Sequence, residues 1–115
     1  MDNTVLAKPK RKRRSDRTHV VYQLTNRVTA EIYIGITVAT GRAYNRSLKE
    51  RWKRHVSRAT HQSHEWNLCE SIRQHGEKAF TREILHLIRG KAAAHSTETA
   101  LIHSLQPALN STIKR

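Results

Sequence analysis

Two short runs of β-branched and aromatic residues, separated by a few polar positions, constrain the fold of this chain more than any other feature. Residues 19–24 (HVVYQL) and 32–36 (IYIGI) have the composition of strands, and the stretch 26–31 between them is polar and short. A connection of this length joins antiparallel neighbours, because a parallel pair needs a much longer crossover. The sequence therefore predicts a β-hairpin near the start of the folded part.

Beyond the hairpin, the apolar spacing changes to that of helices, then of a strand, then of a helix again. Residues 39–47 contain Gly41 and Asn45 and predict a loop, and the apolar residues at 48, 52, 56 and 59 predict an amphipathic helix. A second helix is expected over 66–74, a third strand over 80–88, and a last helix over 91–105 that Pro107 ends. We therefore expect an α+β fold of order β-β-α-α-β-α, with a small three-stranded antiparallel sheet packed against helices.

Length and charge divide the chain into two parts. With 115 residues it has room for one hydrophobic core. Residues 8–17 (KPKRKRRSDR) hold seven basic residues, one acid and no large apolar side chain to bury. We expect residues 1–17 to form a basic, disordered N-terminal arm and residues 18–115 to form the folded domain.

The net charge of +13 indicates a polyanionic partner, most often nucleic acid. The folded part is basic by itself, with fifteen Lys and Arg against seven Asp and Glu in 18–115. A solubilising charge excess is the alternative. An anionic membrane would require an amphipathic helix with large apolar anchors or a lipidation motif, and the sequence shows neither. DNA is the expected partner.

The single cysteine, Cys69, excludes a disulfide within the chain and suits a reducing compartment. No apolar run approaches the ~20 residues that span a bilayer, and the first residues lack the apolar core of a secretory signal. We expect a soluble protein of the cytoplasm, whose basic arm would be a nuclear import signal if the host cell were eukaryotic.

Four residues of the hairpin and the first helix carry groups suited to phosphate chemistry. Cross-strand pairing would place the hydroxyls of Tyr22 and Tyr33 on one face, although the ordinary strand propensity of tyrosine is the alternative. Arg51 and His55 are four residues apart and share one helix face. Arginine clamps phosphate and histidine transfers protons near neutral pH, whereas a solvated basic face would explain this pair without a site.

Glu98 occupies a position of the last helix where an apolar residue is expected. The predicted buried stripe consists of Ala94, Leu101, Ile102 and Leu105, and Glu98 completes its spacing. A carboxylate on an apolar face is costly unless it is paired or binds a metal ion. A core salt bridge is the alternative to a metal ligand. A hard cation such as Mg²⁺ accepts a single carboxylate, because it keeps most of its waters.

Together these residues resemble the pattern of the GIY-YIG nuclease superfamily. VVY at 20–22 and YIG at 33–35 are similar to the two segments that name the family, with Val20 in place of the first glycine. Arg51 and His55 in LKERWKRH, Glu98, and Asn110 in QPALN follow in the family's order and approximate spacing. The resemblance covers about residues 19–112 and implies a stand-alone GIY-YIG endonuclease domain of phage or mobile-element origin, acting in a bacterial or phage-infected host cell.

The resemblance implies a role for each matching residue. Glu98 would hold one Mg²⁺ or Mn²⁺ ion against a phosphate oxygen. Tyr22 would position or deprotonate the attacking water, with His55 as a proton relay. Arg51 and Tyr33 would bind the scissile phosphate and stabilise the charge that develops on it. No small-molecule cofactor is implied.

Two further residues would support the site. Asn110 would orient a neighbouring group by hydrogen bonds, and Gly35 would leave space where the backbone passes close to the site. Which of Tyr22 and His55 is the general base stays open, because a tyrosine pKa near 10 leaves little phenolate at neutral pH.

The arm and the basic face of the first helix are predicted to contact the DNA backbone, which gives affinity without sequence information. The residues concerned are Lys8, Lys10, Arg11, Lys12, Arg13, Arg14, Arg42, Arg46, Lys49, Lys53, Arg54 and Arg58. No separate recognition domain is visible, so we expect a metal-dependent endonuclease of low sequence specificity, or one selective for DNA structure, that leaves 5′-phosphate and 3′-hydroxyl ends. A catalytically inactive DNA-binding module or accessory factor is the alternative. The sequence allows an oligomer without predicting one.

Overall fold

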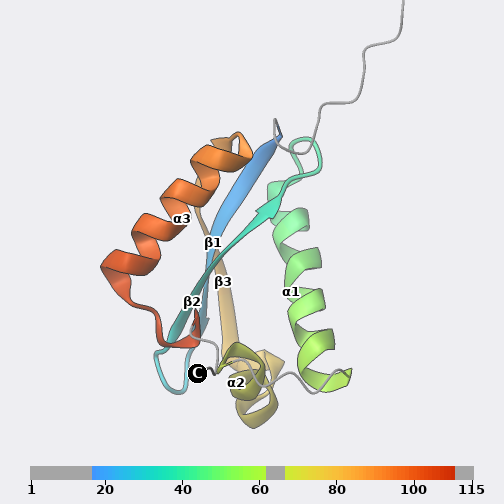
Figure 1. The fold of residues 1–115 in the computed structure, drawn as a ribbon. Helices are drawn as coiled ribbons and strands as arrows, with labels where there is room; N and C mark the ends of the chain where they lie inside the picture. The colour runs from blue at the N-terminus through green and yellow to red at the C-terminus, as the bar shows by residue number, and fades with distance from the viewer. Residues whose placement is uncertain (1–16, 62–66, 111–115) are drawn as a thin grey trace, which may run out of the picture.

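The computed structural model describes residues 17–61 and 67–110, so the predicted arm lies outside the described residues except for Arg17. The regular elements are β1 (Thr18–Asn26), β2 (Ile32–Val38), α1 (Tyr44–His61), α2 (Asn67–His75), β3 (Phe80–Arg89) and α3 (Lys91–Leu105), as Figure 1 shows. The predicted α+β order is confirmed. Within the described residues, no helix combines the length and the apolar character that crossing a membrane would require.

The sheet has the order β2-β1-β3, and both neighbours of β1 run antiparallel to it. Tyr22 in the middle of β1 lies opposite Gly35 on β2. On the other side the register shifts between Val21 and Tyr22, since Val21 pairs with His86 and Tyr22 with Ile84. Because β1 is central, β2 is an edge strand with one side free of sheet partners. The site lies along this edge.

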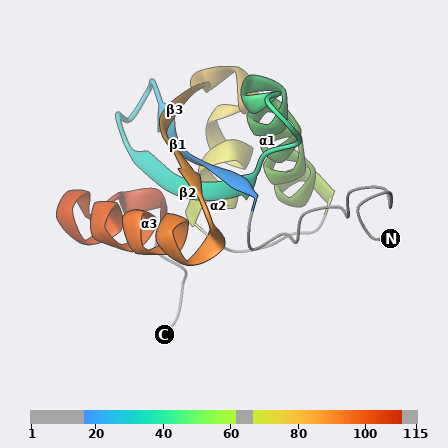
Figure 2. The same ribbon diagram turned by 90° about the horizontal axis from the view of Figure 1, so that it is seen from above.

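The helices cover the two faces of the sheet separately. α1 and α2 pack on one face and α3 on the other, as Figures 1 and 2 show from two directions. Alternate residues of β1 face the first layer, where the core is formed by Val20, Tyr22, Leu24, Leu48, Trp52, Ala59, Leu68, Cys69, Ile72, Phe80 and Leu109. Trp52 and Cys69 are both buried in this layer.

Two details of the helices differ from the prediction. The loop expected over 39–47 is shorter, because α1 begins at Tyr44 and the buried Ser47 bonds to Thr40 N and Ala43 O at 3.0 and 2.8 Å. On α3, Ala94 is buried but Leu105 is 47% exposed, so the predicted buried stripe is wrong at its end. Helical spacing shows which side chains share a face, but it does not show how much of that face the sheet covers.

Asn26 fixes the end of the hairpin, a role that the sequence pattern did not predict. Its side chain is fully buried and its Oδ1 accepts hydrogen bonds from the backbone N–H groups of Val28 and Thr29, at 2.8 and 3.3 Å. Its Nδ2 donates to Ser71 Oγ at 2.7 Å, which joins the hairpin turn to α2. One side chain thus satisfies groups from two elements far apart in sequence.

We expect Asn26→Ala to lower the free energy of unfolding by about 1–3 kcal/mol, because it leaves buried donors and an acceptor without partners. Urea denaturation measures this change. Val28→Ala, at a position of the same turn that is 69% exposed, is the control and should change stability by less than about 0.5 kcal/mol. Equal stability of the two variants would show that Asn26 does not hold the turn.

Candidate active site

The two tyrosines of the hairpin meet on the α1 side of the sheet because of the register. Tyr22 pairs with Gly35, and Tyr33 lies two residues before Gly35 on the same face, so that the two ring centroids are 6.3 Å apart. A Cβ atom on Gly35 would lie 2.5 Å from Tyr22 Oη and 2.8 Å from Tyr33 Cε2. Such distances are shorter than any ordinary contact. The strand therefore needs glycine here, because the Tyr22 side chain lies across it.

His55 joins this pair from α1. Its Nε2 lies 3.0 Å from Tyr22 Oη in a buried hydrogen bond, and its ring stands edge-on to Tyr33 with the centroids 5.2 Å apart. His55 is itself buried, one helical turn after Arg51. The sequence placed His55 on a helix face that could be solvated, and the structure places it against the sheet.

Burial sets the protonation states of this cluster. It raises the pKa of Tyr22 and Tyr33 above the ordinary value, and their proximity raises that of Tyr22 further, against the opposing effect of Arg51. Burial, with Arg51 and Arg58 nearby, lowers the pKa of His55 to about 3. At neutral pH both phenols are protonated and His55 is neutral. In the tautomer that carries its ring proton on Nδ1, His55 accepts the Tyr22 hydroxyl proton through Nε2.

Asn110 closes the outer side of β2. Its Nδ2 donates to the Ile34 carbonyl at 2.7 Å, and its Oδ1 accepts from the Ile34 N–H at 2.6 Å. A side-chain amide thus pairs with both backbone groups of an edge residue, as a further strand would. Since Ile34 lies between Tyr33 and Gly35, Asn110 fixes the backbone that carries the tyrosine cluster.

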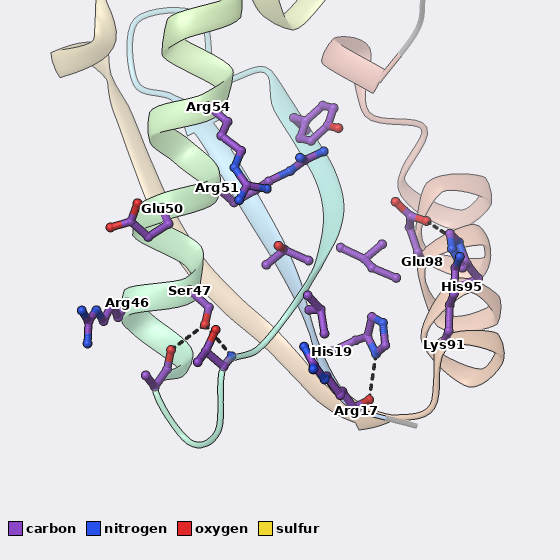
Figure 3. Close-up of a pocket in the computed structure, with 16 residues that line it drawn as sticks. Arg17, His19, Arg46, Ser47, Glu50, Arg51, Arg54, Lys91, His95 and Glu98 are labelled. Carbon is purple, nitrogen blue, oxygen red and sulfur yellow. Dashed lines mark hydrogen bonds and ion pairs between the residues drawn. The ribbon is translucent and has the colours of Figure 1, made fainter. Parts of the chain in front are cut away.

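A cleft of about 810 Å³ runs along β2, with α1 on one side and α3 on the other. Figure 3 shows Arg51 reaching from α1 and Glu98 from α3 on opposite sides of β2. Tyr33 also lines the cleft, whereas the fully buried Tyr22 and His55 lie behind its wall. The structure thus brings three of the predicted site residues to the cleft surface and two directly beneath it.

Arg51 has an incomplete set of partners. Its Nε is buried and has no hydrogen-bond acceptor among the residues that the structure describes. An unsatisfied buried donor costs about 1–3 kcal/mol, and a guanidinium is shaped for a phosphate or a carboxylate. The orphaned N–H is therefore suited to an anion that enters the cleft.

Glu98 faces the same cleft with a side chain that is 19% exposed. Burial raises the pKa of its carboxyl group, and the neighbouring His95 opposes this effect. Within the described part of the chain, its carboxylate lies 3.3 Å from His95 Nδ1 and pairs with no Lys or Arg, which differs from the core salt bridge considered above.

The donor set at Glu98 fits a hard divalent cation. No three His, Cys, Asp or Glu side chains gather at one point in residues 17–61 and 67–110. Mg²⁺ needs no such cage, because it binds through one or two carboxylates together with waters and substrate phosphate oxygens. Glu98 supplies one carboxylate in a cleft whose cationic lining would hold the phosphate.

The cationic lining is only partly the one predicted. Of the basic residues expected to bind DNA, Arg46 and Arg54 line the cleft beside Arg51. Four others lie outside it: Arg42, Lys49, Lys53 and Arg58. The predicted DNA-binding residues of the arm lie outside the described residues: Lys8, Lys10, Arg11, Lys12, Arg13 and Arg14.

Sequence reasoning missed Arg17, Lys91 and His95, which also line the cleft. Arg17 and Lys91 are 74 residues apart, and no spacing rule connects them. The antiparallel register does, because Thr18 pairs with Arg89 and Gly90 N donates to Arg17 O at 3.0 Å. The start of β1 thereby lies beside the start of α3. His95 could have been found from its place one turn before Glu98 on the helix.

Comparison with known proteins agrees with this geometry. Residues 18–111 match the model of the GIY-YIG catalytic domain, and the chain therefore belongs to the GIY-YIG family. Two solved structures of the catalytic domain of the homing endonuclease I-TevI, one of them a mutant, share the fold with a TM-score of 0.63 and 23% identity. They cover 84% of this chain, which spans 92% of the mutant structure and 99% of the other. The curated proteins include no significant match.

Family membership defines the class of protein. The chain carries the fold of a GIY-YIG nuclease domain, and nucleases of this family generally depend on a divalent metal ion. The predicted resemblance to the GIY-YIG family and the predicted fold class are therefore confirmed.

The lowered pKa of His55 predicts a pH dependence of stability. The unfolded chain binds a proton at this residue below about pH 6.5, whereas the folded protein does not until about pH 3. The contribution of His55 to the free energy of unfolding is thus complete above about pH 6.5 and is lost as the pH falls. Between pH 7 and 5 we expect the wild type to lose about 2 kcal/mol more than His55→Gln does in urea unfolding. His103→Gln, at an exposed position of α3, should behave as the wild type, and parallel curves for all three proteins would contradict the assignment.

Proposed function

We propose that this chain is a metal-dependent DNA endonuclease that hydrolyses phosphodiester bonds to 5′-phosphate and 3′-hydroxyl ends. The observation that carries the proposal is the cleft along β2, which is lined by both Arg51 and Glu98. Among residues 17–61 and 67–110, the buried Nε–H of Arg51 has no acceptor and the carboxylate of Glu98 has no Lys or Arg partner. A phosphate would give the Arg51 Nε–H an acceptor, and a divalent cation would give the Glu98 carboxylate a positively charged partner. Membership of a nuclease family, and a fold shared with a homing endonuclease, support the same activity.

Arg51 and Tyr33 would bind the phosphate of the substrate. The guanidinium of Arg51 would donate its free Nε–H to a non-bridging phosphate oxygen, and the protonated Tyr33 hydroxyl can donate a second hydrogen bond from β2. Both groups are positioned by packed elements before the substrate arrives. Once the groups that cover the Arg51 Nε move aside, both donors would stabilise the additional negative charge of the transition state.

Proton transfer would use the buried pair beneath the cleft wall. When water attacks phosphorus and the bond to the 3′ oxygen breaks, one water proton would pass to Tyr22 Oη while Tyr22 passes its own proton to His55 Nε2. The departing 3′ oxygen would take a proton from a second water molecule in the cleft and so become the 3′-hydroxyl. This relay needs no free phenolate, which the raised pKa of Tyr22 disfavours. The negative phosphate would raise the pKa of His55 from its low value and so strengthen it as the final acceptor. Because Tyr22 is buried, residues of the wall would have to shift when the substrate binds.

Glu98 would hold the cation, which when bound supplies a Lewis acid for a phosphate oxygen. Its placement on α3, across β2 from Arg51, would leave room for the phosphate between the two. Asn110 would act as a positioning residue through its two hydrogen bonds to Ile34.

The cleft favours low sequence specificity or recognition of DNA structure. Its basic side chains, among them Arg46, Arg54 and Lys91, are suited to phosphates, and contacts to phosphates carry no sequence information. DNA bound along the cleft would run past the start of β1, where Arg17 lines the cleft.

Cleavage of supercoiled plasmid tests the proposed activity. We expect the wild type to nick or linearise the plasmid with Mg²⁺ or Mn²⁺ and not with EDTA, and Glu98→Gln to lose at least about 100-fold in rate while still binding DNA. Glu50→Gln is the matched control, because Glu50 lines the same cleft from α1 and the variant changes the charge equally. Binding of plasmid by the wild type without cleavage in either metal would favour an inactive DNA-binding module. Equal losses in both variants would indicate a general effect of charge.

The position of the phosphate track can be tested on α1 alone. Arg54 and Lys49 are both exposed, but only Arg54 lines the cleft. We expect Arg54→Ala to reduce the slope of log K against log salt concentration by about 1, and Lys49→Ala to leave it nearly unchanged. Fluorescence anisotropy with a labelled duplex in EDTA measures both slopes. Equal effects would place the DNA on a wider face of the helix than the cleft.

A further inference from the structure

His95 stands beside the proposed metal ligand and has no role in the function described so far. It lies one turn before Glu98 on α3, and its Nδ1 is 3.3 Å from Glu98 Oε1. Both side chains line the cleft, and Figure 3 shows them next to one another on the side of the cleft that faces Arg51. The side chain of His95 is 53% exposed, so packing into the hydrophobic core does not explain why it lies against Glu98.

The distance between the two atoms is that of two donors on one cation. Donors that each lie about 2.1 Å from a shared ion are about 3 Å apart at adjacent octahedral positions. In bundle proteins that bind iron or manganese, a glutamate and a histidine three residues apart on one helix also take part in the metal site, although in the order Glu-x-x-His and not His-x-x-Glu. The pair therefore needs only a small adjustment to hold one ion.

We infer that His95 is a second protein ligand of the cation held by Glu98, an inference that rests on the proposed metal-dependent function. The imidazole coordinates through Nδ1, with its proton on Nε2, where the exposed edge of the ring can reach solvent. Waters and a phosphate oxygen occupy the remaining positions, since the described residues bring no third ligand of this kind to the pair.

The ligand type predicts which metal the site prefers. Carboxylate and water oxygens suit both Mg²⁺ and Mn²⁺, whereas an imidazole nitrogen suits first-row transition metals better than it suits Mg²⁺. His95 thus biases the site against Mg²⁺, and Mn²⁺ is the transition-metal probe closest to Mg²⁺ in its other ligands. The surrounding cations Arg17, Arg46, Arg51 and Lys91 repel a metal ion, so that binding without DNA is weak and best measured at millimolar metal.

The other arrangement consistent with the same distance is an ion pair, in which a protonated His95 donates to Glu98 and only Glu98 touches the metal. The two arrangements differ in whether a nitrogen atom is bound directly to the metal ion. A Mn²⁺ ion bound by His95 shows coupling to ¹⁴N in pulsed electron paramagnetic resonance, and a Mn²⁺ ion bound by Glu98 alone shows none from a directly bound nitrogen.

The experiment titrates the protein with Mn²⁺ alone and records affinity and the ¹⁴N coupling for four proteins: wild type, His95→Ala, Glu98→Gln and His103→Ala. His103 is an exposed histidine of the same helix outside the cleft and serves as the matched control. We expect His95→Ala to lose the ¹⁴N coupling and to bind Mn²⁺ at least about 10-fold more weakly, while competition by Mg²⁺ changes less. His103→Ala should match the wild type.

The outcomes separate the inference from the function on which it rests. Unchanged Mn²⁺ affinity in His95→Ala, with no directly bound nitrogen in the wild type, would overturn the role of His95 and leave the Glu98 site intact. Unchanged affinity in Glu98→Gln would instead remove the metal from Glu98 and with it the metal site of the proposed function.

Discussion

The hydrogen bond between Tyr22 and His55 connects the sheet to α1, and the geometry of the whole site follows from it. The two residues are 33 positions apart and both are buried, with 3.0 Å between Oη and Nε2. The bond forms because Gly35 leaves room for the phenol ring on the neighbouring strand. The burial that accompanies it keeps Tyr22 protonated and His55 neutral, so the protonation states of both groups are set before a substrate binds.

The second constraint is that β2 is an edge strand between helices that cover opposite faces. α1 brings Arg51 to one side of β2, and α3 brings Glu98 and His95 to the other. The positive and negative groups are therefore held apart across the strand instead of neutralising one another. A phosphate with a divalent cation has the complementary charges, and Asn110 holds the strand that separates the two sides. The two helices thus bring together a set of functional groups that neither helix carries alone.

Most of the elements and several of the site residues could be predicted from local patterns. Alternation and a short connection predicted the hairpin, and helical spacing predicted that Arg51 and His55 share a face. Other features were missed because they depend on partners distant in sequence. Ser47 extends α1 into the expected loop, Asn26 ties the hairpin to α2, and Leu105 is exposed although its spacing indicated burial.

The sequence by itself determined the order of the elements, the pair of tyrosines on one strand face, and the anomalous carboxylate on the last helix. These properties depend on side-chain periodicity, which is a local consequence of backbone geometry. Only the tertiary structure decided that Tyr22 and His55 are buried beside the cleft, that Arg51 Nε has no acceptor among the described residues, and that Arg17 and Lys91 line the same cleft. Burial and the distances between elements depend on how the layers pack, and the spacing of residues along one element does not contain that information.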